Sequence, residues 1–390
     1  MVYCWGAFGE KELIEVLKKE GIEPVVYANK MSDYHKDMVV AQEIIALLHS
    51  RKPEGIISYN YFPLLSMIGE MNGLPYLSWI YDCPHYTLLS HTLLNECNHI
   101  FCFDYAFCQE LEAKGARHVV HFPLGVSVAA MEERIAGMER GRRKQYAHEI
   151  AFVGSFYNDK ENRLHHKRPS EKTRGYLDGV MEAQLMIYGS NFISRVLPEE
   201  VIREMEEVYS LKLGEAYLPG VRDLAAGMVN KEITARERER ILAAVAANYK
   251  LHVYTGSQIP DRMAEEEFVN MGYADTVKEM PVIFQESKIN LNITLRSITT
   301  GIPQRVLDIL ACGGFLITNY QPETAACFED GEELVMYSSI KELLEKIDYY
   351  LMHEKERKTI AKKGKEKVKQ FFDLPIRVRE MLNLMKRENG

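Results

Sequence analysis

Short apolar runs alternate with longer amphipathic stretches along the first 125 residues of the chain. The short runs are rich in β-branched and aromatic residues and predict strands, whereas the stretches between them repeat apolar positions every three or four residues and predict helices. Strands that alternate with helices of about 10–15 residues indicate βαβ units and a parallel sheet. The predicted strands are residues 2–5, 24–27, 55–59, 76–81, 99–103 and 118–122, with helical patterns at, for example, 10–20 and 38–50.

A second series of strands starts near residue 149. Residues 160–248, between the first two strands of this series, are highly charged and show helical periodicity without strand signals. We interpret them as a helical insertion, which either shapes an acceptor site or serves as scaffold, and the scaffold role is the more frequent one. The predicted strands are residues 149–153, 251–255, 268–273, 289–293, 315–318 and 334–337.

A polar, basic run at residues 139–144 separates the two series and marks a domain boundary. A length of 390 residues also favours two domains. We therefore predict an α/β protein with two Rossmann-like, doubly wound parallel-sheet domains. The first covers residues 1–140, the second covers residues 146–373 with the insertion at about 160–248, and a final helix lies within residues 374–390.

Composition narrows the class of protein. The chain is 46% hydrophobic and 27% charged, which is typical of a soluble globular protein, and its net charge of −8 argues against a nucleic-acid partner. No apolar run approaches the ~18 residues of a transmembrane segment, and charges near the N-terminus argue against a secretory signal. The seven cysteines lack the spacing of a zinc site, so we expect reduced thiols, a cytoplasmic location and no metal site.

The strongest site signal lies in residues 288–323, which read as strand, polar loop, helix and strand. The polar loop ends at Gly301, and Pro303 suits the first turn of the helix that follows. A helix N-terminus with a glycine at its mouth presents free backbone N–H groups and the positive end of a dipole.

Charged and polar side chains gather around this helix start. Spacings of four and seven residues place Gly301, Gln304, Arg305 and Asp308 on one side of the helix, and Arg296 adds a second cation. This set suits a diphosphate that carries a ribose. The alternative is an exposed Arg305–Asp308 ion pair on a solvated helix, which is common and contributes little to stability.

The stretch GIPQRVLDILACGGFLITNY and the later FEDGEELVMY resemble the donor-binding segment of GT-B glycosyltransferases, and most closely the bacterial CgeB-like, spore-maturation-type branch. The resemblance covers the last third of the chain well and the rest loosely. It implies that the second domain binds a nucleotide-sugar, with UDP as the nucleotide. In related retaining families two acidic residues eight positions apart flank this loop and helix. The second matches Asp308, which would contact the ribose, and the first falls on Thr300, beside the donor sugar.

The resemblance also implies further donor-binding positions at strand ends of the second domain. Gly154 and Ser155 follow the first strand, where related proteins approach the phosphates. Tyr254, Gly256 and Tyr273 lie at the ends of the next two strands, where an aromatic ring can stack on a uracil. A tyrosine at such a position is more often part of the core. The final helix is implied to cross back onto the first domain.

Two strand ends of the first domain carry candidate chemistry. The loop Gly6–Glu10, with Phe8 and Gly9 inside it, allows close approach of a ligand or acceptor, although a plain strand-to-helix turn explains the glycines equally well. Asp82 and His85 follow another strand, and either side chain can take a proton from a hydroxyl group. Their structural alternatives are a helix-capping aspartate and a solvated loop histidine.

Together these features predict a glycosyltransferase that moves a sugar from a nucleotide-sugar, as co-substrate, to a hydroxyl group of a protein or surface-glycan acceptor. We expect no cofactor and no metal, since no DxD site is evident and Arg296 and Arg305 would neutralise the leaving group. A nucleotide-sugar epimerase or a non-catalytic nucleotide-sugar-binding module are the alternatives, and Thr300 in place of an acid gives the second some weight.

Overall fold

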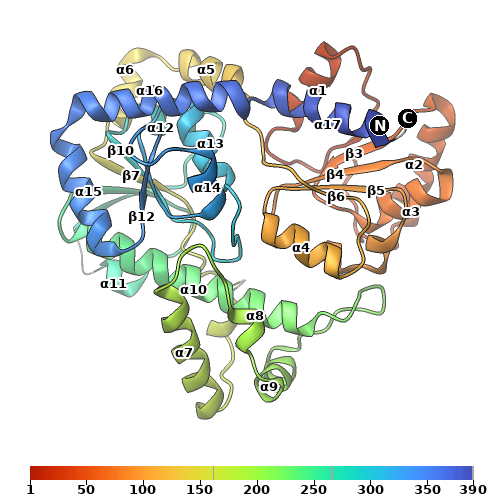
Figure 1. Cartoon of the computed structure of the whole chain (residues 1–390), viewed down its shortest axis with the longest axis horizontal. Helices are drawn as coiled ribbons and strands as arrows, with labels where there is room; N and C mark the ends of the chain where they lie inside the picture. Colours follow the sequence, from red (N-terminus) through yellow and green to blue (C-terminus); the bar gives the residue numbers. More distant parts are fainter. Residues whose placement is uncertain (161, 265–266, 389–390) are drawn as a thin grey trace. The chain divides into compact units, whose positions relative to one another are not determined.

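The computed structural model of the chain describes residues 1–160, 162–264 and 267–388 (Figure 1). The chain forms two compact units that share its length unevenly. Unit 1 contains residues 1–127, 213–220 and 373–390, and unit 2 contains residues 128–212 and 221–372. Each unit is built on a parallel sheet of six strands, as the alternating pattern predicted.

Unit 1 has the strand order β2-β1-β3-β4-β5-β6. Every residue of β3, β4 and β5 is buried, as expected for parallel strands that helices cover on both faces. The strands are β1 (Val2–Tyr3), β2 (Val26–Tyr27), β3 (Ile56–Tyr59), β4 (Tyr76–Ile80), β5 (Asn98–Cys102) and β6 (Val119–His121). The α-helices are α1 (Glu10–Lys19), α2 (Met38–Arg51), α3 (Pro63–Asn72), α4 (Tyr105–Ala113) and α17 (Leu374–Glu388).

Unit 2 has the strand order β12-β11-β10-β7-β8-β9. Its strands are β7 (Ile150–Val153), β8 (Leu251–Tyr254), β9 (Phe268–Gly272), β10 (Ile289–Asn292), β11 (Leu316–Asn319) and β12 (Val335–Tyr337). Its helices are α5 (Val128–Gly137), α6 (Arg140–Arg143), α7 (Glu171–Leu185), α8 (Ile193–Val196), α9 (Glu199–Tyr209), α10 (Val221–Ala246), α11 (Asp261–Ala264), α12 (Met280–Glu286), α13 (Gln304–Ala311), α14 (Pro322–Cys327), α15 (Ile340–Met352) and α16 (Glu354–Phe371).

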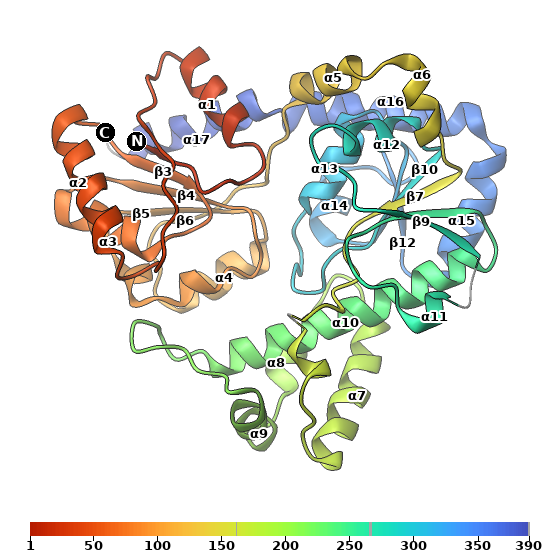
Figure 2. The same ribbon diagram turned by 180° about the vertical axis from the view of Figure 1, so that it is seen from behind.

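Helix α10 joins two apolar cores of unit 2. Its C-terminal half packs on the sheet through Ile241, Leu242 and Val245, which are at most 1% exposed. Its N-terminal half, with Val229 and Ile233, forms a second core with α7, α8 and α9 (Figure 2). At 1.5 Å per residue its 26 residues span about 39 Å, so one rigid element reaches from the helical cluster to the sheet.

The division of the chain differs from the expected one in two places. Helix α5 belongs to unit 2, because it packs against α12, a helix of that unit. The first segment of unit 1 therefore ends at Ser127 and not near residue 140. Residues 213–220, expected within the second domain, belong to unit 1 instead. There the N–H of Leu218 donates to the carbonyl of Leu89 and the N–H of His91 donates to the carbonyl of Ala216.

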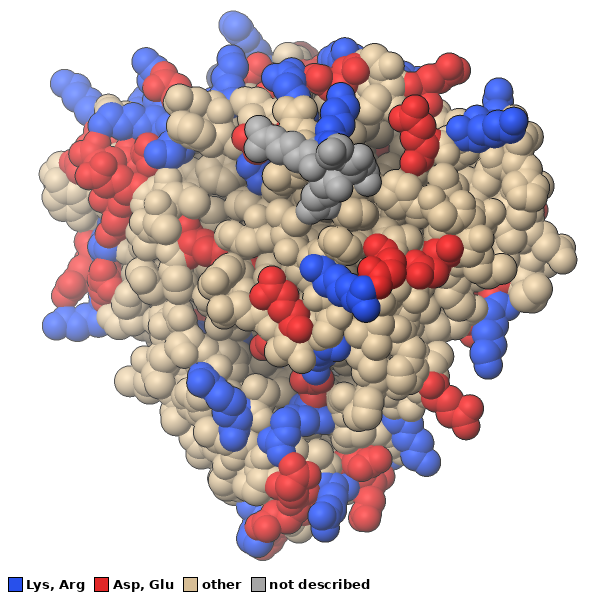
Figure 3. Space-filling view, turned by 45° about the vertical axis from the view of Figure 1, so that its right-hand side comes forward, with Lys and Arg blue, Asp and Glu red and all other residues tan. Residues whose placement is uncertain are grey.

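The surface carries both signs of charge. On the face shown in Figure 3, Lys and Arg side chains are interspersed with Asp and Glu side chains, in keeping with a chain of small negative net charge. In the described residues, none of the helices has the length and apolar character that crossing a membrane requires.

Candidate functional site

The order of strands in unit 2 locates a topological switch point. From β7 the chain continues to β8 and β9 on one side, and then returns to place β10, β11 and β12 on the other side. In open parallel sheets ligands bind beyond the carboxyl ends of the two strands where the order reverses. These ends are Gly154–Ser155, after β7, and Ile293–Thr294, after β10.

The turn after β7 is closely packed around Gly154. A Cβ atom on Gly154 would lie 2.9 Å from the ring of Phe152 and 3.3 Å from Nη1 of Arg238, so a side chain here would displace its neighbours. The hydroxyl of Ser155 shares a hydrogen bond of 2.8 Å with that of Ser257, which follows β8. The glycine therefore permits a side chain from elsewhere to approach the strand end.

That side chain is Arg238 of α10. Its guanidinium donates to the carbonyl of Ser155 at 2.5 Å and to the carbonyl of Ile293 at 2.6 Å, and so bridges the carboxyl ends of β7 and β10. The residue is 8% exposed, and burial lowers the pKa of Arg238. The faces of Phe152 and Tyr157 lie 5.5 and 4.8 Å from the guanidinium, in the range of cation–π contacts.

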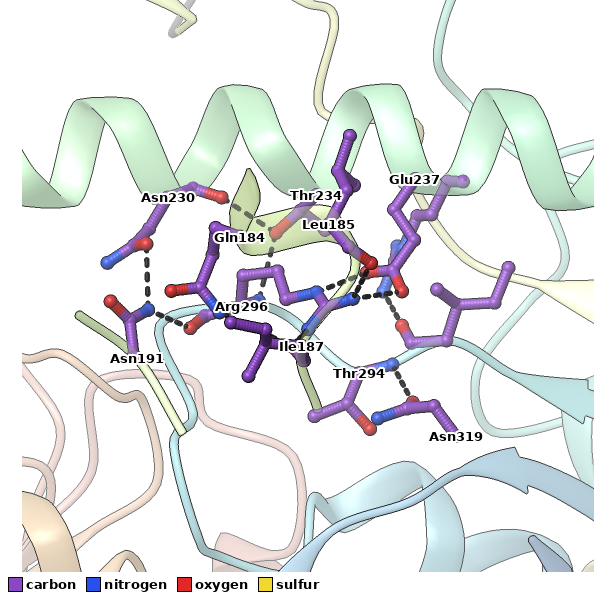
Figure 4. A network of polar contacts seen from close by, with 12 residues as sticks. Gln184, Leu185, Ile187, Asn191, Asn230, Thr234, Glu237, Thr294, Arg296 and Asn319 are labelled. Carbon is purple, nitrogen blue, oxygen red and sulfur yellow. Dashed lines mark hydrogen bonds and ion pairs between the residues drawn. The ribbon is translucent and has the colours of Figure 1, made fainter. Parts of the chain in front are cut away.

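Arg296, predicted as a free cation of this site, forms a buried ion pair (Figure 4). Both oxygens of the Glu237 carboxylate accept from its guanidinium at 2.6 Å, and the carbonyl of Ile187 accepts a third bond at 2.6 Å. The side chains of Arg296 and Glu237 are 8% and 4% exposed. Burial acts to lower the pKa of Arg296, but Glu237 outweighs it and the pKa lies above its usual value.

The network in Figure 4 also fixes the backbone around Arg296. The hydroxyl of Thr234 accepts from the Arg296 N–H at 2.9 Å, and the amide of Asn191 donates to the Arg296 carbonyl at 2.8 Å and to Asn230 at 2.8 Å. Residues of the helical segment between β7 and β8 thus hold the loop after β10 in place. Such satisfied buried polar networks fix one conformation.

A small pocket, partly open to solvent, adjoins this network. Neutral polar groups form much of its lining, and the Thr294 N–H donates to the Asn319 side chain at 2.8 Å across the ends of β10 and β11. The lining comes from the loop after α7 and from the segments that follow β10 and β11: Gly189, Ser190, Asn191, Thr294, Leu295, Arg296, Ile298, Thr299, Asn319 and Gln321.

Helix α13 begins at Gln304, with Pro303 as the residue before its first turn. The amide of Gln304 donates to the Asp308 carboxylate at 2.9 Å, whereas the guanidinium of Arg305 turns toward the Met280 sulfur and lies 5.3 Å from the Phe284 ring. Asp308 is 4% exposed. The alternative of a solvated Arg305–Asp308 surface pair is therefore wrong.

Burial raises the pKa of Asp308, and the nearby charge of Arg305 and the bond from Gln304 partly oppose that rise. Gly301 is buried, and Thr300 is half-buried with its carbonyl accepting from the Glu323 N–H at 3.0 Å. Gly301, Gln304 and Asp308 thus lie in a well-packed helix start, and Arg305 remains half-exposed at its edge.

The three positions predicted near a base differ sharply in exposure. Tyr254 is 4% exposed, and its hydroxyl bonds to Nε2 of His148 at 2.6 Å, within the sheet face. This is the core-tyrosine alternative. Tyr273, by contrast, is 72% exposed, and a Cβ on Gly256 would lie 3.6 Å from its ring. Gly256 and Tyr273 therefore form an accessible glycine–aromatic pair at the ends of β8 and β9.

In unit 1, Asp82 follows β4 and is held by Asn60. Asn60 follows the adjacent strand β3 in a left-handed conformation, with φ of 61°, and is 2% exposed. Its amide donates to the Asp82 carboxylate at 2.7 Å, and its oxygen accepts from the N–H groups of Tyr81 and Asp82 at 2.9 and 3.0 Å. Asp82 itself is exposed, so an oriented carboxylate stands at this strand end.

His85 lies nearby with its ring fixed by the backbone. Its Nε2 is 3.1 Å from the carbonyl of Tyr61, and because a carbonyl only accepts, Nε2 carries the proton when the ring is neutral. Burial lowers the pKa of His85, which favours that neutral form. Nδ1 is then the nitrogen that can accept a proton.

The glycine loop after β1 is closed by its own chain. Gly6 and Gly9 have φ of 101° and 92°, which glycine adopts freely. The Glu10 carboxylate accepts from the N–H of Trp5 at 2.8 Å and from the N–H of Gly6 at 3.1 Å, and Phe8 is half-buried between the two glycines. The Glu10 carboxylate thus occupies the N–H groups that a ligand would need, which favours the alternative of a plain strand-to-helix turn.

The residues of α10 that hold the site were not predicted from the sequence. Asn230, Thr234, Glu237 and Arg238 are all buried although polar. The first three recur at intervals of four and three, which places them on one helical face, and Arg238 follows directly. A polar stripe of this kind within an otherwise apolar helix face is the signal that would have found them. Among the described residues, no group of three or more His, Cys, Asp and Glu side chains is arranged to hold a metal ion.

Comparison with known proteins adds to this geometry. Residues 236–383 match the protein-family model described as "Glycosyl transferase-like". No curated protein sequence matches the chain.

The fold is shared with solved structures of low sequence identity. Anabaena Alr3699/HepE in complex with UDP-glucose is 10% identical, with a TM-score of 0.59 and 99% of each chain covered. The same protein with UDP and glucose gives a TM-score of 0.57 at 10% identity, covering 99% of this chain and 98% of that one. A glycosyltransferase from Rickettsia africae ESF-5 gives 0.52 at 12% identity, covering 99% and 97%. The family model and the two-sheet GT-B fold together indicate a glycosyl transferase.

Proposed function

We propose that the protein transfers a sugar from a nucleotide-sugar, with UDP as the nucleotide, to a hydroxyl group of a protein or surface-glycan acceptor. The observation that carries the proposal is the switch point of unit 2, where the Arg238 guanidinium joins the carboxyl ends of β7 and β10 and the segment after β10 leads into α13. The UDP and UDP-glucose bound to structures of the same fold support the choice of nucleotide. We also propose that the protein is of the CgeB-like branch and that residues 160–248 are an insertion in its second domain.

The proposed roles in unit 2 follow from chemistry and burial. Arg305 is the accessible cation that would neutralise the leaving diphosphate, because its guanidinium is half-exposed and free of a carboxylate bond in the described residues. Arg296 would act through the loop that its ion pair holds. Asp308 would accept from ribose hydroxyls, and Tyr273 would stack on the base. The developing negative charge would be met by protein cations and N–H groups.

On unit 1, Asp82 and His85 are the proposed bases that take the proton of the acceptor hydroxyl. Asp82 is exposed and oriented by Asn60, and His85 presents Nδ1 in its neutral form. Each group is held in position by a hydrogen bond and carries an atom that is able to accept a proton, as a general base requires.

Thermal unfolding in a panel of nucleotides and nucleotide-sugars tests the proposal. A ligand at 100 times its dissociation constant adds about 2.7 kcal/mol to the free energy of unfolding, so UDP and at least one UDP-sugar should raise the melting temperature clearly. The best donor should then release UDP in the presence of an acceptor extract, with and without EDTA. Absence of stabilisation by every nucleotide-sugar would overturn the assignment, and binding without release over hours would favour a non-catalytic module.

A further inference from the structure

A buried cation without a carboxylate partner lies at the switch point of unit 2. Arg238 is 8% exposed, and its two terminal nitrogens donate to the carbonyls of Ser155 and Ile293. In the described part of the chain no carboxylate is paired with it, since the adjacent Glu237 gives both oxygens to Arg296. The charge of neighbouring Glu237 raises the pKa of Arg238, and the charge of Arg305 lowers it.

This arrangement is costly if its only task is to join two strands. A buried charge without an ionic partner loses its hydration without full compensation, and carbonyl groups can be satisfied by a neutral amide at lower cost. The ring faces of Phe152 and Tyr157 offset part of this loss. Residues that break a stabilising rule in this way are concentrated at functional sites.

The local backbone is built around the guanidinium. Gly154 leaves room for it, because a Cβ there would lie 3.3 Å from Nη1 of Arg238. Tyr157, whose ring lies against it, adopts φ of 56°, a left-handed conformation that is uncommon for a bulky residue. The Nε atom of Arg238 is buried, and none of the residues that the structure describes forms a hydrogen bond with it.

We propose that Arg238 is a positioning residue of the nucleotide-sugar site, which ties the ends of β7 and β10 together and sets a fixed positive charge there for a nucleoside diphosphate. The inference rests on the proposed function and deepens it, because it assigns to α10 the role of aligning the diphosphate. Arg296 cannot fill this role with its charge, since Glu237 neutralises it.

Binding of UDP and of uridine to Arg238 variants tests the inference. Arg238→Gln keeps a donor for one carbonyl but removes the charge, so we expect UDP to bind at least tenfold more weakly while uridine affinity changes less than twofold. Arg238→Lys keeps the charge but loses the two-pronged geometry, so it should recover part of the UDP affinity and show a lower kcat at near-normal KM. If Arg238→Gln does not fold, the UDP affinity, kcat and KM of Arg238→Lys test the inference in its place.

Arg236→Gln is the matched control, because Arg236 lies on the same helix and pairs with Glu232 and Asp178. It should leave both affinities unchanged. The inference would be overturned if Arg238→Gln lost UDP and uridine affinity equally, or if its UDP affinity were unchanged. In either case the proposed function would stand as long as the wild-type protein binds UDP. If the wild-type protein binds no uridine nucleotide, the proposed function fails and this inference falls with it.

Discussion

The two sheets reverse their strand order at equivalent places, after β1 in unit 1 and after β7 in unit 2, and they carry opposite charges there. In unit 1 the turn N–H groups are occupied by the Glu10 carboxylate. In unit 2 the strand-end carbonyls are occupied by the Arg238 guanidinium. The first arrangement fills the anion-binding groups of the turn with an internal anion, whereas the second adds a positive charge. The first turn is thus closed by an internal carboxylate, whereas the second carries the buried cation on which the proposed diphosphate site depends.

The largest expected effect concerns the buried pair that holds the unit 2 site. Glu237→Gln leaves the Arg296 guanidinium buried without its carboxylate, and we expect a loss of about 3–5 kcal/mol in the free energy of unfolding. Urea titration measures it. Glu182→Gln is the control, since Glu182 is about half-exposed beside Arg240 and should cost less than about 1 kcal/mol. Similar small losses in both variants would contradict the structural role.

An intermediate effect is expected at Asp308. Asp308→Asn keeps the shape of the side chain but removes the charged acceptor, so UDP affinity should fall by about 1.5–3 kcal/mol. Titration calorimetry measures this change. The matched variant in unit 1 is Asp82→Asn, which should leave UDP affinity unchanged and slow turnover. A loss of UDP affinity in the unit 1 variant alone would reverse the assignment of the two units.

The smallest effect is expected at the unit 1 turn. Glu10→Ala frees the N–H groups of Trp5 and Gly6 to bind water, and we expect a loss of about 1 kcal/mol in stability with no change in UDP affinity. Glu15→Ala, on the exposed side of the same helix, should change stability by less than half of that. Weaker UDP binding in Glu10→Ala would show that this turn takes part in donor binding after all.

The fold was predictable because the strands and helices of both sheets leave local patterns in the sequence. Buried parallel strands are continuous apolar runs, and the helices between them have clear periodicity, so strands such as 56–59 and 289–292 appeared within a residue or two of their observed bounds. Residues 213–220 group with unit 1 through contacts with Leu89 and His91, which are distant in sequence and leave no local pattern. The first segment of unit 1 ends at Ser127 and not near residue 140 for a related reason, since a charged run marks exposure and not the packing of α5.

The site was predictable only in part. Glycines and charges near strand ends identified the region of Gly154, Gly301 and Arg305, because parallel strands bring their carboxyl ends to one edge. Helix α10 decides which charges are paired. Its Glu237 forms an ion pair with Arg296, and its Arg238 donates to the carbonyls at the ends of two strands. Pairing between a helix and a loop about 60 residues later is set by tertiary packing, and a single sequence does not display it.

The interrupted course of unit 1 has a consequence for biosynthesis. Its first and last segments are separated in the chain by about 250 residues that build mostly unit 2. At translation rates of about 5–20 residues per second, α1 leaves the ribosome tens of seconds before its packing partner α17 exists. The buried side chains of α17, Val378 and Met381, then find their places only after unit 2 has been made. The unit whose translation begins first is therefore completed last, and its nascent sheet is the stretch on which a chaperone has the longest time to act.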